Sequence, residues 1–159
     1  MIQRIQSIFL LLASGAVGSL FAPLMALGKV IHGTTDDASS PLADGVFTIT
    51  DNAVLIGLTA AAAVGFGVAI FLFRNRKWQI RLSQIGNVLS GGLLAYGYFL
   101  FQKAAATLKM VDIDANHAAS EVGYGFGVVA PILAMALSLV AIRFIKRDEA
   151  IVRSADRLR

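Results

Sequence analysis

The stretch Ala53–Phe73, AVLIGLTAAAAVGFGVAIFLF, decides the fold class, because its 21 residues include no charged side chain. About 20 apolar residues are needed to cross the ~30 Å hydrocarbon core of a bilayer as a helix. A helix of a soluble four-helix bundle would need a polar face at helical spacing, and this stretch has none. It therefore predicts a membrane-spanning helix.

Three further stretches, 5–27, 85–102 and 122–144, are also apolar enough to span a bilayer. The first follows Arg4, as a signal peptide would, but its 23 residues exceed the roughly 7–15 residues of a signal-peptide core, so we expect it to be retained. Only 15% of the residues are charged and 57% are hydrophobic, which leaves too little polar surface for a soluble domain. The sequence thus predicts an all-α fold: an integral membrane four-transmembrane-helix bundle with a cytoplasmic C-terminal helical extension. This single membrane domain, 1–159, would comprise spans 5–27, 53–73, 85–102 and 122–144, outer loops 28–52 and 103–121, a basic cytoplasmic loop 74–84 and a cytoplasmic tail 145–159.

Lys and Arg divide unequally between the two sides of this arrangement. One side carries eleven of the 14, and the other carries only Lys29, Lys103 and Lys109. The positive-inside rule therefore places both termini and the loop 74–84 in the cytoplasm. The net charge of +4 is then a topology signal rather than the footprint of a nucleic acid. The residues expected to contact lipid head groups or a partner are Arg74, Arg76, Lys77, Arg81, Arg153 and Arg157.

Three stretches of the chain resemble one protein family: MIQRIQSIFLLLA at 1–13, FLFRNRKWQIRL at 71–82 and AIRFIKRDEAIVRSADRLR at 141–159. They are similar to the short inner-membrane proteins of Bacteroidota grouped as domain of unknown function 4293. The resemblance covers the whole chain and keeps the order of the four spans. It implies a location in the bacterial cytoplasmic (inner) membrane. It supplies no activity, catalytic residue or cofactor.

The second outer loop holds the candidate metal ligands Asp112, Asp114, His117 and Glu121 within ten residues. His117 and Glu121 are four residues apart and could share a helix face, which is one way to bind Zn²⁺ or another divalent ion. Short Asp-x-Asp runs are common in exposed loops, however, so we expect a solvated loop with no metal and no cofactor. Cys is absent, which excludes disulfides and thiolate sites.

The first outer loop contains two short alternating runs, KVIH at 29–32 and VFTIT at 46–50. Such runs around a turn-rich middle predict a small β-hairpin that rests on the helices. Asp51 or Asn52 is expected to cap the helix that follows.

Small residues spaced four apart recur within the predicted spans, and they predict surfaces for close helix packing. They are Gly57, Ala61 and Gly65, then Gly91 with Ala95, and Gly123 with Gly127. The partner is left open: the chain's own helices, a second copy or a foreign subunit. Pro131 is expected to kink or loosen the fourth helix near its middle.

The tail 145–159 is expected to continue the fourth helix, because its apolar residues recur at helical spacing. The cytoplasmic acids lie in this tail and four of the basic residues lie in the loop 74–84. We therefore expect the tail to fold back along this face, with Ile151, Val152, Ala155 and Leu158 covering the region near Trp78.

No ionisable residue lies at the middle of a predicted span, and a transporter or proton relay usually needs one. We therefore expect a non-enzymatic small integral inner-membrane protein, a scaffold or accessory subunit of a larger membrane complex. Its partners would be the bilayer and other membrane subunits or a second copy. The alternative is a small transporter or lipid-binding module working as a homo-oligomer, with a cavity lined by Asn87, Ser90 and Thr59. A third hypothesis is a membrane enzyme with a metal site on the outer face.

Overall fold

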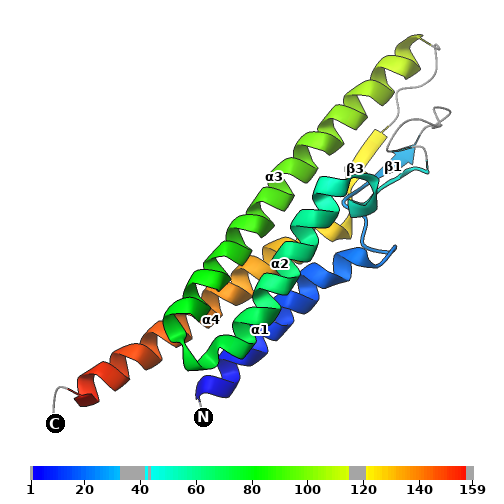
Figure 1. Cartoon of the computed structure of the whole chain (residues 1–159). Helices are drawn as coiled ribbons and strands as arrows, with labels where there is room; N and C mark the ends of the chain where they lie inside the picture. Colours follow the sequence, from blue (N-terminus) through cyan, green and yellow to red (C-terminus); the bar gives the residue numbers. More distant parts are fainter. Residues whose placement is uncertain (1, 33–41, 43, 115–120, 157–159) are drawn as a thin grey trace.

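The computed structural model describes residues 2–32, 42, 44–114 and 121–156, and four helices account for most of them (Figure 1). The helices are α1 (Ile2–Gly18), α2 (Ala53–Phe71), α3 (Arg76–Asp114) and α4 (Val129–Asp156). α1 and α3 each pack against both α2 and α4. Both ends of the chain lie at the same end of the molecule (Figure 1). The protein is mostly helical, as the sequence predicted.

Two helical runs among the described residues have the length and composition of membrane spans, Ala53–Arg74 and Phe126–Ile151. The expected first span, 5–27, is shorter in the structure. α1 ends at Gly18, and the 3-10 turn η1 (Ser19–Phe21) completes an apolar helical run of Ile5–Phe21. The helix stops there because Ala22 precedes Pro23. A residue before proline is sterically biased to extended backbone, and Ala22 has ψ 134°.

α2 begins where the sequence predicted. The Asn52 side chain accepts a hydrogen bond from the Val54 backbone N–H at 2.9 Å, so Asn52 is the N-cap of α2. The sequence alone allowed either Asp51 or Asn52 in this role. Asp51 instead is the last residue of the short 3-10 turn η2 (Ile49–Asp51), whose N-cap is Thr48. The Asp51 carboxylate accepts a hydrogen bond of 2.6 Å from the Thr48 backbone N–H as part of a capping box.

α3 is longer at both ends than the expected helix 85–102. Its 39 residues extend about 58 Å at 1.5 Å per residue. Most of the expected basic loop 74–84 forms its first turns, and only the 3-10 turn η3 (Leu72–Arg74) and Asn75 separate it from α2. At the other end, the expected loop 103–121 starts as helix up to Asp114. The segment KAAATLKM at 103–110 explains this extension, because it is rich in strong helix formers.

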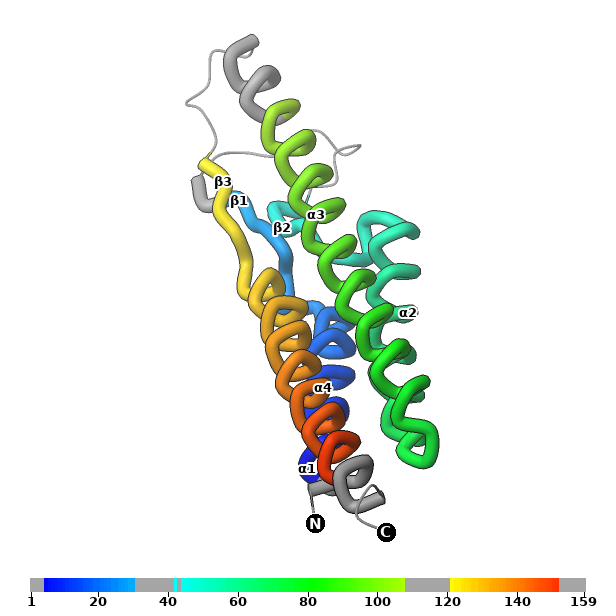
Figure 2. Tube along the Cα trace, turned by 90° about the vertical axis from the view of Figure 1, so that its left-hand side faces the viewer, coloured from blue at the N-terminus to red at the C-terminus, as the bar shows by residue number. Residues whose placement is uncertain are grey.

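A three-stranded antiparallel sheet lies at the other end of the molecule from the termini (Figure 2). β1 (Gly28–His32) is the central strand and pairs with β2 (Val46–Phe47), which confirms the predicted hairpin. On its other edge β1 pairs with β3 (Glu121–Tyr124), with Gly28 opposite Tyr124. The prediction of a helix from Val122 is therefore wrong, because this segment completes the sheet.

α4 begins at Val129, after the 3-10 turn η4 (Phe126–Val128). Pro131 is consequently the third residue of α4 and lies in its first turn. A proline is tolerated there, because the first N–H groups of a helix have no partner within the helix. The prediction of a kink near the middle of this helix is therefore wrong, because the helix begins later than the sequence predicted and Pro131 lies near its start.

The three strands, η2 and the part of α3 after Gly97 share one hydrophobic core, and together they are called the cap here. Leu42, Phe47, Ile49 and Phe101 are buried in it. The ring of Phe101 lies so close to Gly28 that a Cβ on Gly28 would be 2.2 Å from it. A second buried cluster, around Leu10 and Phe66, fills the space between the helices further from the sheet.

The tail continues α4 as one helix to Asp156, as predicted, and it runs straight on past the other helices (Figure 1). It does not fold back over the start of α3, so that prediction is wrong for the residues described. Ile151 and Trp78 remain 54% and 55% exposed. The Asp148 carboxylate accepts a hydrogen bond of 2.8 Å from the Gln6 side chain. This bond joins the tail to α1. The side chains of Val152, Ala155 and Leu158 lie outside those described.

Candidate functional site

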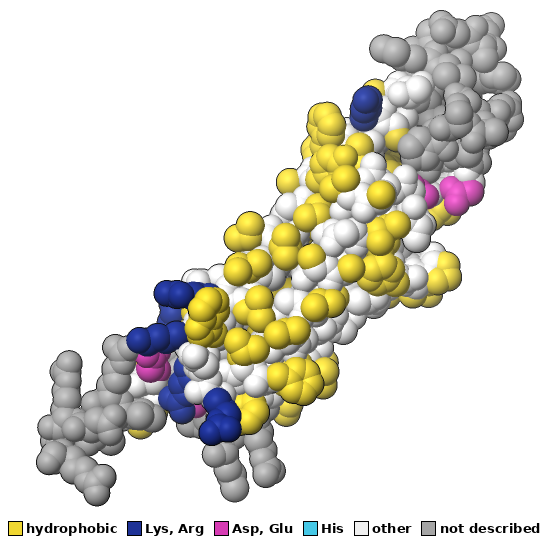
Figure 3. Space-filling view, viewed as in Figure 1, with side chains coloured by type: hydrophobic (Ala, Val, Ile, Leu, Met, Phe, Trp, Pro, Cys, Tyr) yellow, Lys and Arg dark blue, Asp and Glu magenta, His cyan; other side chains and the backbone are white. Residues whose placement is uncertain are grey.

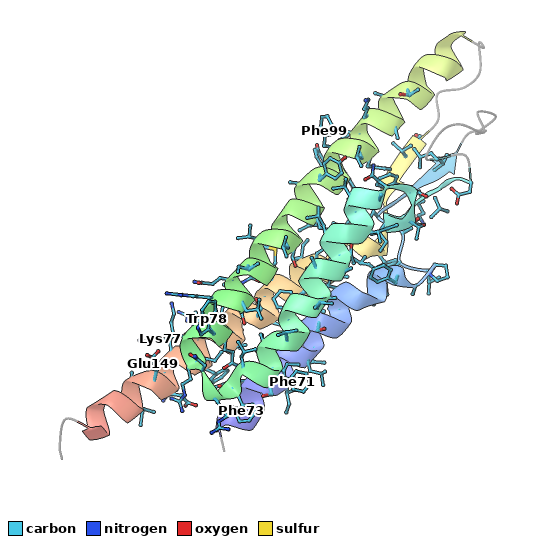
Figure 4. All side chains as sticks on the ribbon, viewed as in Figure 1. Phe71, Phe73, Lys77, Trp78, Phe99 and Glu149 are labelled. Atoms are coloured by element: carbon cyan, nitrogen blue, oxygen red, sulfur yellow. The ribbon has the colours of Figure 1, made fainter. Side chains whose placement is uncertain are left out.

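Exposed aromatic side chains gather at two levels along the helices. On α3, Trp78 marks one level and Phe99 marks the other, about 31 Å further along at 1.5 Å per residue. Phe71, the last residue of α2, and Phe73 of η3 lie near the level of Trp78 (Figure 4). Between these levels the visible surface is apolar (Figure 3), and α3 has no charged residue from Leu82 to Gln102. Aromatic belts about 30 Å apart are typical of the two interfaces of a bilayer.

Basic side chains gather at the end that carries both termini (Figure 3). Arg74, Arg76, Lys77 and Arg81 all belong to the turn between α2 and α3 or to the first turns of α3. The Arg81 guanidinium lies over the Trp78 ring, 5.4 Å from its centroid. A cation and an aromatic ring in this geometry attract each other. Of the other two predicted contacts, Arg153 lies on α4 with its side chain outside those described, and Arg157 lies outside the described residues.

The residues predicted for close helix packing fall into three groups. Gly65 is buried and Gly91 is half-buried, with a Cβ on Gly91 meeting Met135 at 4.0 Å. Gly57, Ala61 and Ala95 are exposed, so they are open to a partner outside the chain. Of the last pair, Gly123 lies in β3 and Gly127 lies in the 3-10 turn η4, so neither is part of an α-helix.

Gly127 does allow a close approach, but to an irregular backbone segment rather than to a helix. A Cβ on Gly127 would lie 2.6 Å from the Met25 carbonyl oxygen, and one on Gly125 would lie 2.1 Å from the Ala26 carbonyl oxygen. The backbones are joined there, because the Gly127 N–H donates to Ala26 at 2.8 Å.

The candidate metal ligands are not assembled among the described residues, which contain no group of three or more His, Asp or Glu side chains able to hold an ion. Asp112 and Asp114 lie in the last turn of α3, with side chains outside those described, and Glu121 begins β3. His117 lies outside the described residues.

The polar side chains between the helices differ in their bonding partners. The Thr59 hydroxyl donates to the Leu55 carbonyl of its own helix at 2.7 Å. Ser138 of α4 donates to the Asn87 side chain of α3 across the helix interface. The Ser90 hydroxyl is buried without a partner in the part of the chain that the structure describes. Thr59, Asn87 and Ser90, which were expected to line a transport cavity together, therefore share no hydrogen bond with one another among those described.

A groove of about 730 Å³ opens on the side of the molecule, between the ends of α1 and α4 and below the sheet. Its walls come from α1 and η1, the segment Ala22–Leu27, the sheet, η4 and the first turns of α4. The lining side chains are mostly apolar: Ala16, Pro23, Leu24, Met25, Ala26, Val46, Phe126, Val129, Ala130 and Leu133. Among the described lining residues, only Ser19, Lys29 and Tyr124 carry polar side-chain atoms.

The polar lining residues differ in what they can offer to a ligand. The Ser19 hydroxyl already donates to the Ala16 carbonyl at 2.7 Å. The Tyr124 ring stacks on Tyr98 with centroids 6.3 Å apart, and the Tyr124 oxygen lies 3.4 Å from the Gln102 side-chain nitrogen. Desolvation, and after it the neighbouring Tyr98, raises the pKa of Tyr124. Lys29 is the one charged residue in the described lining.

Sequence reasoning missed this groove, because it assigned both walls to continuous helices. Two signals in the sequence point to it. Pro23 ends α1 early, and the glycines of GYGFG at 123–127 allow two backbones to lie in contact. Each signal is visible alone, but their meeting depends on residues about a hundred positions apart.

Comparison with known proteins gives a family and no activity. A family model described as "Domain of unknown function (DUF4293)" matches residues 2–158, which confirms the family that the sequence resembles. A search of curated proteins found no match.

Proposed function

Since the chain belongs to the family of domain of unknown function 4293, which brings no activity with it, we propose its role from the structure. It is a non-enzymatic integral membrane protein whose four helices all cross the bilayer, and it holds the cap on the outer face. In a bacterial cell it lies in the cytoplasmic membrane, as a scaffold or accessory subunit of a larger membrane assembly.

The observation that carries four crossings is the common direction of α2 and α4. β2 leads into α2 through η2, β3 leads into α4 through η4, and both strands belong to one sheet. The two helices with the composition of membrane spans therefore both start at the sheet and run away from it. If both cross the bilayer, the chain between them must cross back, and α3 is that chain. By the same reasoning α1 brings the chain to the sheet from the end that carries the N-terminus.

The polar residues of α3 explain why its composition resembles a span less than that of α2 does. Ser83 and Ser90 are buried, and Asn87 is half-buried with its side chain bonded to Ser138. Lipid would contact the exposed apolar residues of α3 instead, such as Ile85 and Val88. Polar groups that bond between helices are compatible with a membrane interior.

The basic end then faces the cytoplasm and the cap faces outward, in agreement with the positive-inside rule. A scaffold role is supported by the exposed small residues Gly57 and Ala61 on α2. Small residues on a lipid-facing helix let another helix approach closely.

Topology is tested with single cysteines, because the chain has none of its own. Exposed Thr50 and Thr107 on the cap and exposed Asn75 at the basic end are each changed to Cys. In intact cells an impermeant maleimide should label T50C and T107C, and it should label N75C only after the cells are opened. Labelling of N75C in intact cells, or protection of T107C, would refute four crossings with the cap outside.

The scaffold role is tested by purification in mild detergent and identification of the proteins that co-purify. Gly57→Leu should remove a partner that wild type retains. The matched control is Gly15→Leu, since Gly15 is also an exposed glycine, on α1. A chain that purifies without another protein would overturn the scaffold role and leave the topology standing.

A further inference from the structure

We propose that the groove between α1 and α4 is a binding site for one anionic phospholipid, with an acyl chain along its apolar walls and the phosphate at Lys29. The proposal rests on the membrane topology proposed above, which sets the groove in the outer half of the bilayer.

The position of the groove fits a lipid. Its apolar part includes Ala16 of α1 with Ala130 and Leu133 of α4, which lie on the helices toward the middle of the molecule. Its opposite end is formed by Lys29, Val46 and Tyr124 of the sheet, at the level of the outer aromatic belt. A lipid bound there would have its chain beside helices and its head group beside the cap, as it does in the surrounding bilayer.

Part of the irregular backbone in the groove wall is suited to face an acyl chain, because several of its N–H groups are already bonded within the protein. The Leu27 N–H donates to Phe47 at 2.8 Å, and the Gly125 N–H donates to Leu27 at 3.0 Å. The Met25 N–H donates to Ala22 at 3.0 Å. Unpaired backbone groups are costly in contact with lipid, so each of these bonds makes the wall more compatible with an acyl chain. These three amides of the wall are paired within the protein.

The size and charge of the groove select the ligand class. A volume of about 730 Å³ lies within the roughly 300–1,000 Å³ of ordinary ligand sites. The rim is strongly apolar, with Leu24 86% and Phe126 82% exposed. Lys29 supplies a single positive charge at the head-group level, and cationic pockets between membrane helices bind anionic head groups. A ligand with one long apolar part and one negative group matches this lining.

The head-group half of the proposal is tested by native mass spectrometry of the full chain in detergent, with added phosphatidylglycerol or phosphatidylcholine. Wild type should retain one lipid and prefer phosphatidylglycerol. Lys29→Gln should weaken phosphatidylglycerol binding about fivefold, which corresponds to ~1 kcal/mol for one charge near the head group. Lys103→Gln is the matched control, since Lys103 is an exposed lysine of the cap outside the groove lining. Equal effects of the two changes would overturn the assignment of Lys29.

The acyl-chain half is tested with Leu133→Trp, which fills the groove. The control is Leu139→Trp, because Leu139 is an exposed leucine on the same helix outside the groove lining. Only Leu133→Trp should reduce retention of both lipids. Unchanged retention, or a protein dimer that this variant separates, would overturn the proposal. The maleimide labelling pattern is a separate measurement, so a failed lipid site and a failed topology are distinguishable.

Discussion

Gly127 provides the sharpest test of how the groove wall is built, because a methyl group there would meet backbone rather than a movable side chain. A Cβ at this position would lie 2.6 Å from the Met25 carbonyl oxygen and 2.7 Å from the Ala26 carbonyl oxygen. Relieving these contacts requires the two segments to separate, which stretches the 2.8 Å bond from the Gly127 N–H to Ala26. Overpacking of this kind costs about 1–3 kcal/mol and the lost hydrogen bond about 1 kcal/mol. Gly127→Ala should therefore lower the free energy of unfolding by about 2–4 kcal/mol.

The control is Gly65→Ala in α2. Gly65 is also buried, but a Cβ there would meet nothing within 4 Å. Alanine is favoured over glycine inside a helix by roughly 0.5–1 kcal/mol, so this change should be neutral or stabilising. Thermal unfolding in detergent, followed by circular dichroism, separates the two. At ~2–4 °C per kcal/mol for a chain of this size, Gly127→Ala should lower the midpoint by roughly 5–15 °C. Equal midpoints for the two variants would refute the backbone contact between the walls.

Three further changes test the cap and the helix contacts by the same unfolding measurement. Phe101→Ala should lower the free energy of unfolding by about 3–5 kcal/mol, because Phe101 is buried in the cap. Phe99 is exposed, so Phe99→Ala should change it by no more than about 0.5 kcal/mol. Similar losses of stability in the two variants would contradict the cap core. Ser138→Ala should cost about 1 kcal/mol by leaving Asn87 without its donor, and no loss would mean that this bond contributes nothing to the helix interface. Asn52→Ala should lower the free energy of unfolding by about 1 kcal/mol, because it removes the N-cap hydrogen bond of α2. An unchanged unfolding midpoint would count against that role.

The sequence was most informative where a local pattern decides the structure. The charge-free run of α2, its N-cap residue Asn52 and the hairpin of β1 with β2 each depend on residues near one another along the chain. The late end of α3 is also visible in principle, in the helix formers of 103–110, although residues 103–121 are predicted to form an outer loop. Charge in that segment indicates exposure to water, and an exposed segment can still be a helix.

The remaining misses come from contacts between distant parts of the chain. The residues around Glu121 do not indicate that a strand begins there, because its pairing partner β1 is separated from it in the sequence by α2 and α3. For the same reason the groove could not be predicted, and neither could the bond between Gln6 and Asp148. The tail was expected to fold back over the start of α3, with charge choosing its position and apolar contacts holding it there. The structure instead continues α4 as one helix to Asp156.

The central place of β1 in the sheet has a consequence for biosynthesis. Its β2 edge can be covered soon after translation, but its other edge waits for β3, which follows only after α2 and α3 have been made. At about 5–20 residues per second this interval is roughly 5–20 s. During it the nascent chain displays an unpaired strand edge, and such an edge invites pairing with other chains. A ribosome that stalls before Glu121 would leave that edge open permanently, so quality control would have an exposed strand edge by which to recognise the unfinished protein.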